Sequence, residues 1–215
     1  MVIVLCIVSI LFSYLMGSIP NSLIIGKLFY NKDVREYGSH NLGGTNTGRV
    51  LGKKAGIAVM ILDQIKAVAA ILLVYTLFRF TFPDAIKASI YLSMIGLVLG
   101  HCYPVFAGFK GGKAVAVTFG ILFITNIWIY MITLAIYVIL LKLTKYVSFG
   151  SIIVFFISGA LCFIPFFQTA PLLFNLQFDF IYPILLLVIA VFIVIKHRAN
   201  IDRLQKGTES KITWM

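Results

Sequence analysis

Apolar residues dominate the chain in long, nearly unbroken runs that alternate with short segments rich in glycine and charge. A helix that crosses a bilayer core of about 30 Å needs roughly 20 apolar residues. The runs lack the period-two alternation of a transmembrane barrel, since residues 181–195 are apolar at nearly every position. We therefore expect an all-α, polytopic membrane bundle of about seven transmembrane helices. The predicted spans lie near residues 2–26, 55–78, 85–100, 114–126, 127–141, 147–167 and 180–195.

Two interpretations fit the apolar run at 114–141. If this run is a single tilted helix, the chain has six spans instead of seven, and the basic C-terminal tail lies outside. At 1.5 Å per residue, residues 114–126 cover only about 20 Å, which is short for a complete crossing. We favour two short helices that turn near Thr125 and Asn126, because this arrangement accommodates both the length and the charge distribution.

Composition supports an integral membrane protein. The 215 residues are 61% hydrophobic and 12% charged, whereas soluble domains are roughly 45–50% apolar and about 25% charged. This hydrophobicity also excludes a disordered chain. The three cysteines show neither a disulfide framework nor the spacing of metal ligands, so we expect no metal and no cofactor.

The positive charge indicates how the helices are oriented. Fifteen of the 18 Lys and Arg residues lie in the segments that follow the first, third, fifth and seventh predicted spans. Cytoplasmic segments of membrane proteins are enriched in Lys and Arg. We therefore predict that the N-terminus lies outside and the C-terminus lies in the cytoplasm, and we expect no nucleic-acid partner because the charge is confined to these segments.

The first of these segments reads GSHNLGGTNTGR from Gly38 to Arg49. Glycines permit tight turns, while successive backbone N–H groups and a forked Arg form a cradle for an anion. Phosphate is the ligand that this pattern favours. A solvated loop of turn-forming residues is the alternative for such a cluster taken alone.

The second segment runs from Gly100 to Lys113 and continues directly into an apolar helix. Lys113 would then lie at a helix N-terminus, where free N–H groups and the helix dipole favour an anion. A nucleotide P-loop needs a glycine, four further residues and then Gly-Lys-Ser/Thr. The segment does not match, because Ala107 occupies the position of the first glycine and Ala114 follows Lys113. A cytoplasmic anchor with a glycine turn is the alternative.

The third segment, from His197 to Glu209, follows the last predicted span. In a continuing helix His197 and Asn200 would lie on one side, since residues three and four apart are neighbours. A basic tail that binds anionic lipid is the alternative, although it does not explain the His and Asn. His197 and Asp202 also have a His-x4-Asp spacing, which we interpret as coincidence.

Two ionisable residues, Asp63 and Lys66, fall inside the second predicted span. Ionisable groups within a membrane span are costly and are often functional. At a spacing of i, i+3 they can pair with each other. We favour a structural ion pair that supports the first segment over direct contact with a ligand.

Together the three segments resemble the motifs of the bacterial acyl-phosphate-dependent glycerol-3-phosphate acyltransferases. The resemblance covers nearly the whole chain, the motifs occur in the same order, and Asp63 and Lys66 resemble a recurring pair of that family. The chain departs from the family pattern at His40 and Ala114, where glycine is expected.

The resemblance implies a single integral membrane acyltransferase domain over residues 1–215, in the bacterial cytoplasmic membrane, with its active site at the cytoplasmic face. The implied reaction moves a fatty acyl group from acyl phosphate to the 1-hydroxyl of sn-glycerol 3-phosphate, giving lysophosphatidate and phosphate as the first step of phospholipid synthesis. Its implied partners are these two substrates, membrane lipid and an enzyme that produces acyl phosphate.

The resemblance also implies roles for individual residues. Catalysis falls to Ser39, Arg49, Lys113, His197 and Asn200. Substrate binding falls to Asn41, Gly43, Thr45, Asn46, His101, Lys110, Gly111, Gly112 and Arg203. The candidate general bases are His101 and His197, since imidazole titrates at about 6.5, and the phosphate of the substrate itself is a third candidate.

A small transporter for an organic phosphate is the alternative function. Transporters place binding groups near the membrane midplane on broken helices within repeated halves. The chain shows no internal repeat, and its polar residues gather at one predicted face of the membrane. The acyltransferase is therefore the favoured hypothesis.

Overall fold

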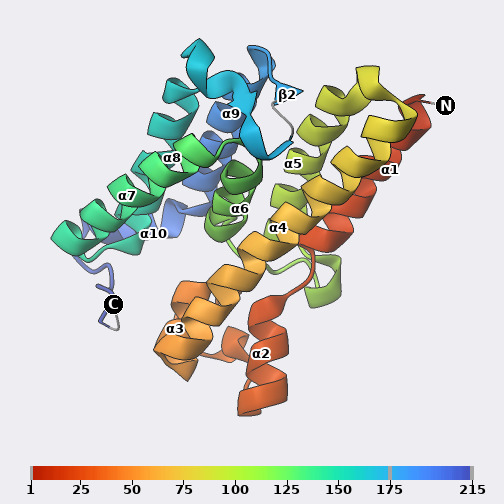
Figure 1. Ribbon diagram of the computed structural model, residues 1–215. Coiled ribbons are helices and arrows are strands. Elements are labelled where there is room, and N and C mark those ends of the chain that lie inside the picture. The colour runs from red at the N-terminus through yellow and green to blue at the C-terminus, as the bar shows by residue number, and fades with distance from the viewer. Residues whose placement is uncertain (1, 174–175, 214–215) are drawn as a thin grey trace. The chain divides into compact units, whose positions relative to one another are not determined.

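The computed structural model describes residues 2–173 and 176–213, and these are mostly helical (Figure 1). The chain divides into two compact units, residues 1–121 and residues 122–213. The boundary falls within α6 (Val115–Thr125). Each unit is described by itself below, and the single domain expected over residues 1–215 stays a prediction.

The first unit consists of helices with short connections. Its elements are α1 (Val2–Gly17), α2 (Asn21–Tyr30), η1 (Val34–Glu36), α3 (Gly44–Leu51), α4 (Lys53–Thr81), η2 (Pro83–Ala85), α5 (Ile86–Cys102), η3 (Val105–Ala107) and the first turns of α6. α1 and α5 lie side by side over much of their length (Figure 1). A Cβ atom at Gly96 or Gly100 would overlap the backbone of Ile10 or Tyr14, so these glycines set the close approach of the two helices, as small residues do between membrane helices.

The first predicted span, residues 2–26, is found as the apolar segment Ile3–Tyr30, but its helix is interrupted between Gly17 and Asn21. Pro20 has no backbone N–H to donate to the preceding turn. The helix restarts around its carbonyl, which accepts from the N–H groups of Leu23 and Ile24 at 2.9 and 3.0 Å. The break exposes the carbonyl of Ile19 to a side chain of α4.

Three glycines bring α3 against the start of α4. A Cβ at Gly56 would lie 2.7 Å from the Cα of Gly48 and 2.8 Å from the carbonyl oxygen of Gly44. The two helices are joined through Gly52, whose φ of +94° is a backbone conformation that favours glycine. This packing fixes α3, which carries the end of the first basic segment, against the long helix α4.

The second unit contains the last turn of α6 and the C-terminal half of the chain. Its further elements are α7 (Ile127–Thr144), α8 (Val147–Leu161), η4 (Pro165–Gln168), β1 (Thr169–Ala170), η5 (Pro171–Leu173), β2 (Leu176–Gln177), α9 (Ile181–Lys196) and α10 (Arg198–Gln205). β1 and β2 form an antiparallel pair in which Thr169 faces Gln177. α8 packs against both α7 and α9.

The predicted turn within the run 114–141 is confirmed. α6 ends at Thr125, and α7 begins at Ile127. Asn126 caps α7, since its Oδ1 accepts from the backbone N–H of Ile129 at 2.9 Å. Its Nδ2 donates to the carbonyl of Phe167 at 2.6 Å, which ties the turn to the connection after α8.

Apolar helices are found at each predicted span, but they differ in length. Four helical segments are long and apolar enough to cross a membrane, namely Ile3–Tyr30, Lys53–Thr81, Pro83–Ala107 and Ile127–Thr144. α9 and α10 are bent by 61° at their junction and would together make a fifth. α6 and α8 are apolar but shorter. An integral membrane fold is therefore supported, whereas the number of seven crossings and the orientation of the termini stay predictions.

We predict that Gly56→Ala destabilises the first unit. Alanine favours helix by about 1 kcal/mol over glycine, but here its Cβ would meet the backbone of α3, and such overpacking costs about 1–3 kcal/mol. The measurement is the thermal unfolding midpoint in detergent. Gly43→Ala is the matched control, because no atom lies within 4 Å of its Cβ position and its φ is −136°. A midpoint for Gly56→Ala equal to that of the control would contradict the prediction.

Candidate functional site

Asn46 anchors the loop that carries the first segment. It is buried, with 2% of its surface exposed. Its Oδ1 accepts from the N–H of Ser39 at 2.8 Å, while its Nδ2 donates to the carbonyls of Val34 and Tyr37 at 3.0 and 3.1 Å. The structure thus uses Asn46 to hold the loop, and Ser39 and Arg49 lie exposed on either side of it along the chain.

The remaining residues of the first segment differ in burial. Asn41, Gly43 and Thr45 are partly exposed. Thr47, which was not among the predicted site residues, is fully buried and shares a hydrogen bond of 2.5 Å with Ser22 of α2. His40 has a φ of +56°, which agrees with the expectation that glycine would suit this position.

Arg35 lies in η1, just before the first segment, and its carbonyl oxygen is 2.8 Å from Nδ1 of His40. Its Nη2 donates to Oδ2 of Asp33 at 2.7 Å, and its Nη1 donates to the carbonyl of Ala107 in η3 at 3.4 Å. The hydrogen bond from Arg35 lowers the pKa of Asp33 to about 2, so this carboxylate stays ionised over the working pH range. A small apolar cluster of Leu23, Val34, Leu42 and Ala107 packs beside the connection.

The second segment folds closely around His101. The carbonyl of His101 accepts from the N–H of Gly112 at 3.0 Å. A Cβ at Gly111 would overlap the backbone of His101, and a Cβ at Gly112 would overlap its imidazole at Nε2. Both glycines are therefore needed for the approach of His101, and the N–H of Gly112 is engaged within the chain.

The lysines of the second segment lie on either side of this glycine pair. Lys110 is exposed, and Lys113 is partly exposed two residues before α6 begins. Between Lys113 and α6, Ala114 is buried with a φ of +61°. Like His40, Ala114 takes a conformation that glycine adopts more readily.

Beneath these segments lies a buried polar cluster. Lys66 and Asp63 form the predicted ion pair, with Nζ 2.9 Å from Oδ1 and with side chains only 5% and 3% exposed. Asn21 of α2 donates to the same carboxylate oxygen at 2.9 Å. Lys66 also donates to the carbonyl of Ile19 at 2.8 Å, and its Nζ lies 3.2 Å from Nδ1 of His101. The cluster therefore joins the α1–α2 break, α4 and α5.

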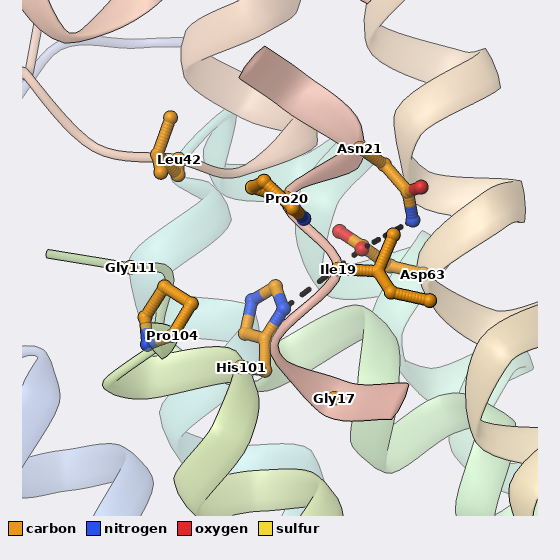
Figure 2. Close-up of a pocket in the computed structure, with 9 residues that line it drawn as sticks. All are labelled: Gly17, Ile19, Pro20, Asn21, Leu42, Asp63, His101, Pro104 and Gly111. Carbon is orange, nitrogen blue, oxygen red and sulfur yellow. Dashed lines mark hydrogen bonds and ion pairs between the residues drawn. The ribbon is translucent and has the colours of Figure 1, made fainter. Parts of the chain in front are cut away.

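A small pocket opens above this cluster (Figure 2). The space within it, part of which is continuous with solvent, is about 190 Å³. Its lining combines apolar residues from several segments with the polar side chains of the cluster: Gly17, Ile19, Pro20, Asn21, Leu42, Asp63, His101, Pro104 and Gly111. The first and second predicted segments both contribute to it, through Leu42 and through His101 with Gly111.

In the second unit, Glu209 organises the third segment. Its Oε1 accepts from Nδ2 of Asn200 at 2.6 Å and from Oγ of Ser148 at 2.8 Å, while its Oε2 accepts from Nε of Arg203 at 2.7 Å. Burial opposes ionisation of Glu209, but the hydrogen bonds from Asn200, Arg203 and Ser148 outweigh it and lower the pKa of this carboxyl. The C-terminal tail is held further by the N–H of Ile212, which donates to the carbonyl of Lys145 at 2.9 Å.

His197 is oriented by its own helix. The side chain is 3% exposed, and its Nδ1 lies 2.8 Å from the carbonyl oxygen of Ile193. A carbonyl only accepts, so the proton of a neutral ring is on Nδ1. Asp202 is exposed. The hydrogen bond to Ile193 takes the place that the aspartate of a His–Asp pair would fill, which supports the interpretation of the His-x4-Asp spacing as coincidence.

The described structure thus brings the first two segments together within one unit. The third segment belongs to the other unit, so the expectation that all three form one pocket stays a prediction, as do the roles of the individual residues. Within residues 2–173 and 176–213, no group of three or more His, Cys, Asp or Glu side chains offers a metal site. The exposed cations of the basic segments suit anionic ligands instead.

Sequence reasoning assigned no role to the residues that hold these segments: Asn21, Asp33, Arg35, Ser148 and Glu209. Asp33 and Arg35 carried a local signal, since an Asp two residues before an Arg can accept both its backbone and its side-chain hydrogen bonds, as here. Asn21 and Ser148 meet partners 42 and 61 residues away, and no local pattern indicates such contacts.

Comparisons with known proteins agree with this arrangement. A family model described as glycerol-3-phosphate acyltransferase matches residues 7–207. A glycerol-3-phosphate acyltransferase of Listeria monocytogenes serovar 1/2a is 42% identical over 207 residues, which cover 95% of this chain and 96% of the relative. One of Enterococcus faecalis is 39% identical over 209 residues, which cover 97% and 92% of the two chains.

Two solved structures have a similar fold. They are crystal structures of PlsY (YgiH), an integral membrane glycerol 3-phosphate acyltransferase, in a glycerol 3-phosphate form and a lysophosphatidic acid form. The first has a TM-score of 0.80 and 31% identity, and the match covers 97% of this chain and 96% of that one. The second has a TM-score of 0.80 and 30% identity, with 97% and 95% covered.

We predict that Lys66→Met is strongly destabilising because it leaves the carboxylate of Asp63 buried without its cation. Breaking a buried pair in this way costs about 3–5 kcal/mol, whereas replacing both partners with apolar residues is often tolerated. The double variant Asp63→Leu, Lys66→Met should therefore recover part of the thermal unfolding midpoint that the single variant loses. A double variant as unstable as Lys66→Met alone would show that the uncompensated charge is not the cause.

Proposed function

The chain belongs to the glycerol-3-phosphate acyltransferase family, and on this premise we propose that its acyl donor is an acyl phosphate. The hydroxyl oxygen at position 1 of sn-glycerol 3-phosphate attacks the acyl carbonyl carbon. The bond from that carbon to the phosphate oxygen breaks, phosphate leaves, and the hydroxyl proton passes to a base. The products are lysophosphatidate and inorganic phosphate.

The observation that carries the proposal is that the first unit joins two basic, glycine-rich segments. Arg35 contacts His40 of the first segment through its carbonyl and Ala107 of the second through its guanidinium, and both segments contribute to the pocket beside Asp63 and His101. Both proposed substrates carry phosphate, so paired basic segments match their charge. An acyl phosphate is an activated mixed anhydride, and orienting the partners and stabilising the developing charge can supply most of the rate.

We assign the binding of the acyl phosphate, or the stabilisation of its leaving phosphate, to Ser39, Arg49, Lys113 and Asn200. Support comes from the exposed position of Arg49 and the partial exposure of Lys113 at the start of α6. Lys110, with the Gly111–Gly112 turn, is assigned to glycerol 3-phosphate. Arg203 and His197 are assigned to the same reaction on the strength of the family resemblance, with the substrate phosphate, His101 or His197 as the proton acceptor.

We place the reaction at the cytoplasmic face of the bacterial cytoplasmic membrane. Support comes from the distribution of Lys and Arg, since fifteen of 18 lie in the four segments predicted to be cytoplasmic. The acyl donor then comes from an enzyme that makes acyl phosphate on the same side, and the lipid product enters the inner leaflet.

We predict that the purified chain forms lysophosphatidate from labelled glycerol 3-phosphate when acyl phosphate is supplied, and not when acyl-coenzyme A or acyl-carrier protein is supplied. The measurement is chromatography of the labelled lipid, with heat-denatured protein as the control. Product with only one of the other donors would overturn the proposed donor. An absence of product with every donor would contradict the acyl transfer itself.

We further predict that Arg49→Ala and Lys113→Ala each lower kcat/KM by about 100-fold or more, because preorganised donors to a developing anion contribute about 10²–10³. The control is Lys54→Ala, which removes an exposed cation near Arg49 in the chain that has no assigned role. The amount of folded protein in the membrane is measured for each variant. Near-normal turnover by both Arg49→Ala and Lys113→Ala would refute their assignment to the phosphate.

A further inference from the structure

The side chain of Lys66 has three acceptors around it, and an ammonium group has three N–H donors and no acceptor. The acceptors are the carbonyl oxygen of Ile19 at 2.8 Å, Oδ1 of Asp63 at 2.9 Å and Nδ1 of His101 at 3.2 Å. Lys66 is only 5% exposed. Each of its donors is therefore matched to one buried acceptor, and the imidazole is one of the three.

This arrangement determines where the proton of His101 lies. Because Lys66 donates to Nδ1, that nitrogen must present its lone pair, and the proton of a neutral ring is on Nε2. A protonated imidazolium would turn an N–H toward the ammonium at 3.2 Å and would add a second buried cation beside a single carboxylate. A neutral lysine that accepted from Nδ1 would leave Asp63 buried without a cation, which is strongly unfavourable.

The other ring nitrogen faces the second segment. Nε2 lies against the open side of Gly112, where a Cβ would overlap it. Figure 2 shows one ring nitrogen turned toward Asp63 and the other turned away from it, with His101 and Gly111 both lining the pocket. The N–H of Gly112 already donates to the carbonyl of His101 at 3.0 Å. The donor that the second segment presents at this point is therefore the imidazole N–H.

We propose, on the basis of the proposed function, that His101 serves the site as a neutral Nε2–H donor to a phosphate oxygen of a bound substrate. Asp63 and Lys66 act through His101 as positioning residues that hold this tautomer. A ring whose Nδ1 lone pair is engaged by an ammonium and whose Nε2 carries a proton cannot accept the hydroxyl proton. His101 is thereby removed from the candidate bases, and His197 and the substrate phosphate remain.

The tautomer is measured directly by long-range ¹H–¹⁵N correlation spectra of protein labelled at its three histidines. The signals of His101 are assigned by their absence in His101→Gln. We expect the protonated nitrogen to correlate with both ring C–H protons, which identifies Nε2. A proton on Nδ1, or an imidazolium near neutral pH, would overturn the proposal. This spectrum does not depend on acyl transfer, so it stands even if the activity assay above yields no lipid.

The positioning role is tested in the same spectra. Lys66→Met should allow a substantial Nδ1–H population, whereas Lys66→Arg, which keeps a cationic donor, should preserve the Nε2–H form. An unchanged tautomer in Lys66→Met would refute the role of Lys66. If Lys66→Met does not fold, the proposal is tested by the tautomer in the wild-type spectrum and by the kcat/KM values of the His101 variants.

Two substitutions at His101 separate a donor from a base. The amide nitrogen of Gln can occupy the position of Nε2, whereas that of Asn corresponds to Nδ1. If His101 is a donor, His101→Asn should lower kcat/KM for glycerol 3-phosphate by about ten- to hundredfold, the range for a lost hydrogen bond to a charged group, and His101→Gln should lose clearly less. If His101 is instead a general base, both variants should lower kcat/KM by about 10²–10⁴-fold. Equal losses of that size in folded variants would overturn the proposal.

Discussion

The first unit depends on one buried ammonium group. The Nζ of Lys66 joins the break between α1 and α2, the carboxylate of Asp63 on α4 and the imidazole of His101 at the end of α5. A charge inside an apolar helix bundle is tolerated only when its hydrogen bonds are satisfied. The interruption at Pro20 serves this purpose, because an unbroken helix would keep the carbonyl of Ile19 for its own backbone. The irregular geometry of the first helix and the geometry of the pocket therefore have the same cause.

Glycine has two different uses in the candidate site, and the sequence does not separate them. Runs of glycine beside cations are typical of phosphate loops, in which backbone N–H groups contact the anion. Gly111 and Gly112 instead make room for His101, and Gly48 and Gly56 make room for the crossing of α3 and α4. In both places the absent Cβ permits a close approach next to a candidate site residue, His101 itself or the Arg49 that α3 carries. Positive charge and hydrogen-bond donors can then come from side chains rather than from the loop backbone.

The features that sequence reasoning predicted are those determined by neighbours along the chain. The apolar helices, the turn at Asn126 and the ion pair of Asp63 with Lys66 follow from run length, charge distribution and the i, i+3 spacing. Family likeness also indicated His40 and Ala114 as positions for glycine, and both have positive φ values of 56° and 61°. The remaining contacts depend on tertiary packing. Asn21 with Asp63, and Ser148 with Glu209, are separated by 42 and 61 residues, and only the folded chain brings them together.

Acidic residues in this protein position cations and amides instead of cancelling the positive charge of the basic segments. Asp33, Asp63 and Glu209 each form an ion pair, with Arg35, Lys66 and Arg203 respectively. The pKa of Asp33 and that of Glu209 are both lowered, so their stabilising contributions are present above the pKa values of the unfolded chain and are lost only as the pH falls through the lower folded values. With 18 basic and seven acidic side chains, the formal net charge is +11, so these carboxylates organise the segments without removing the excess positive charge that attracts anions. The proposed site for two phosphate-bearing substrates would need this division, because a carboxylate that contacted the substrate directly would repel it.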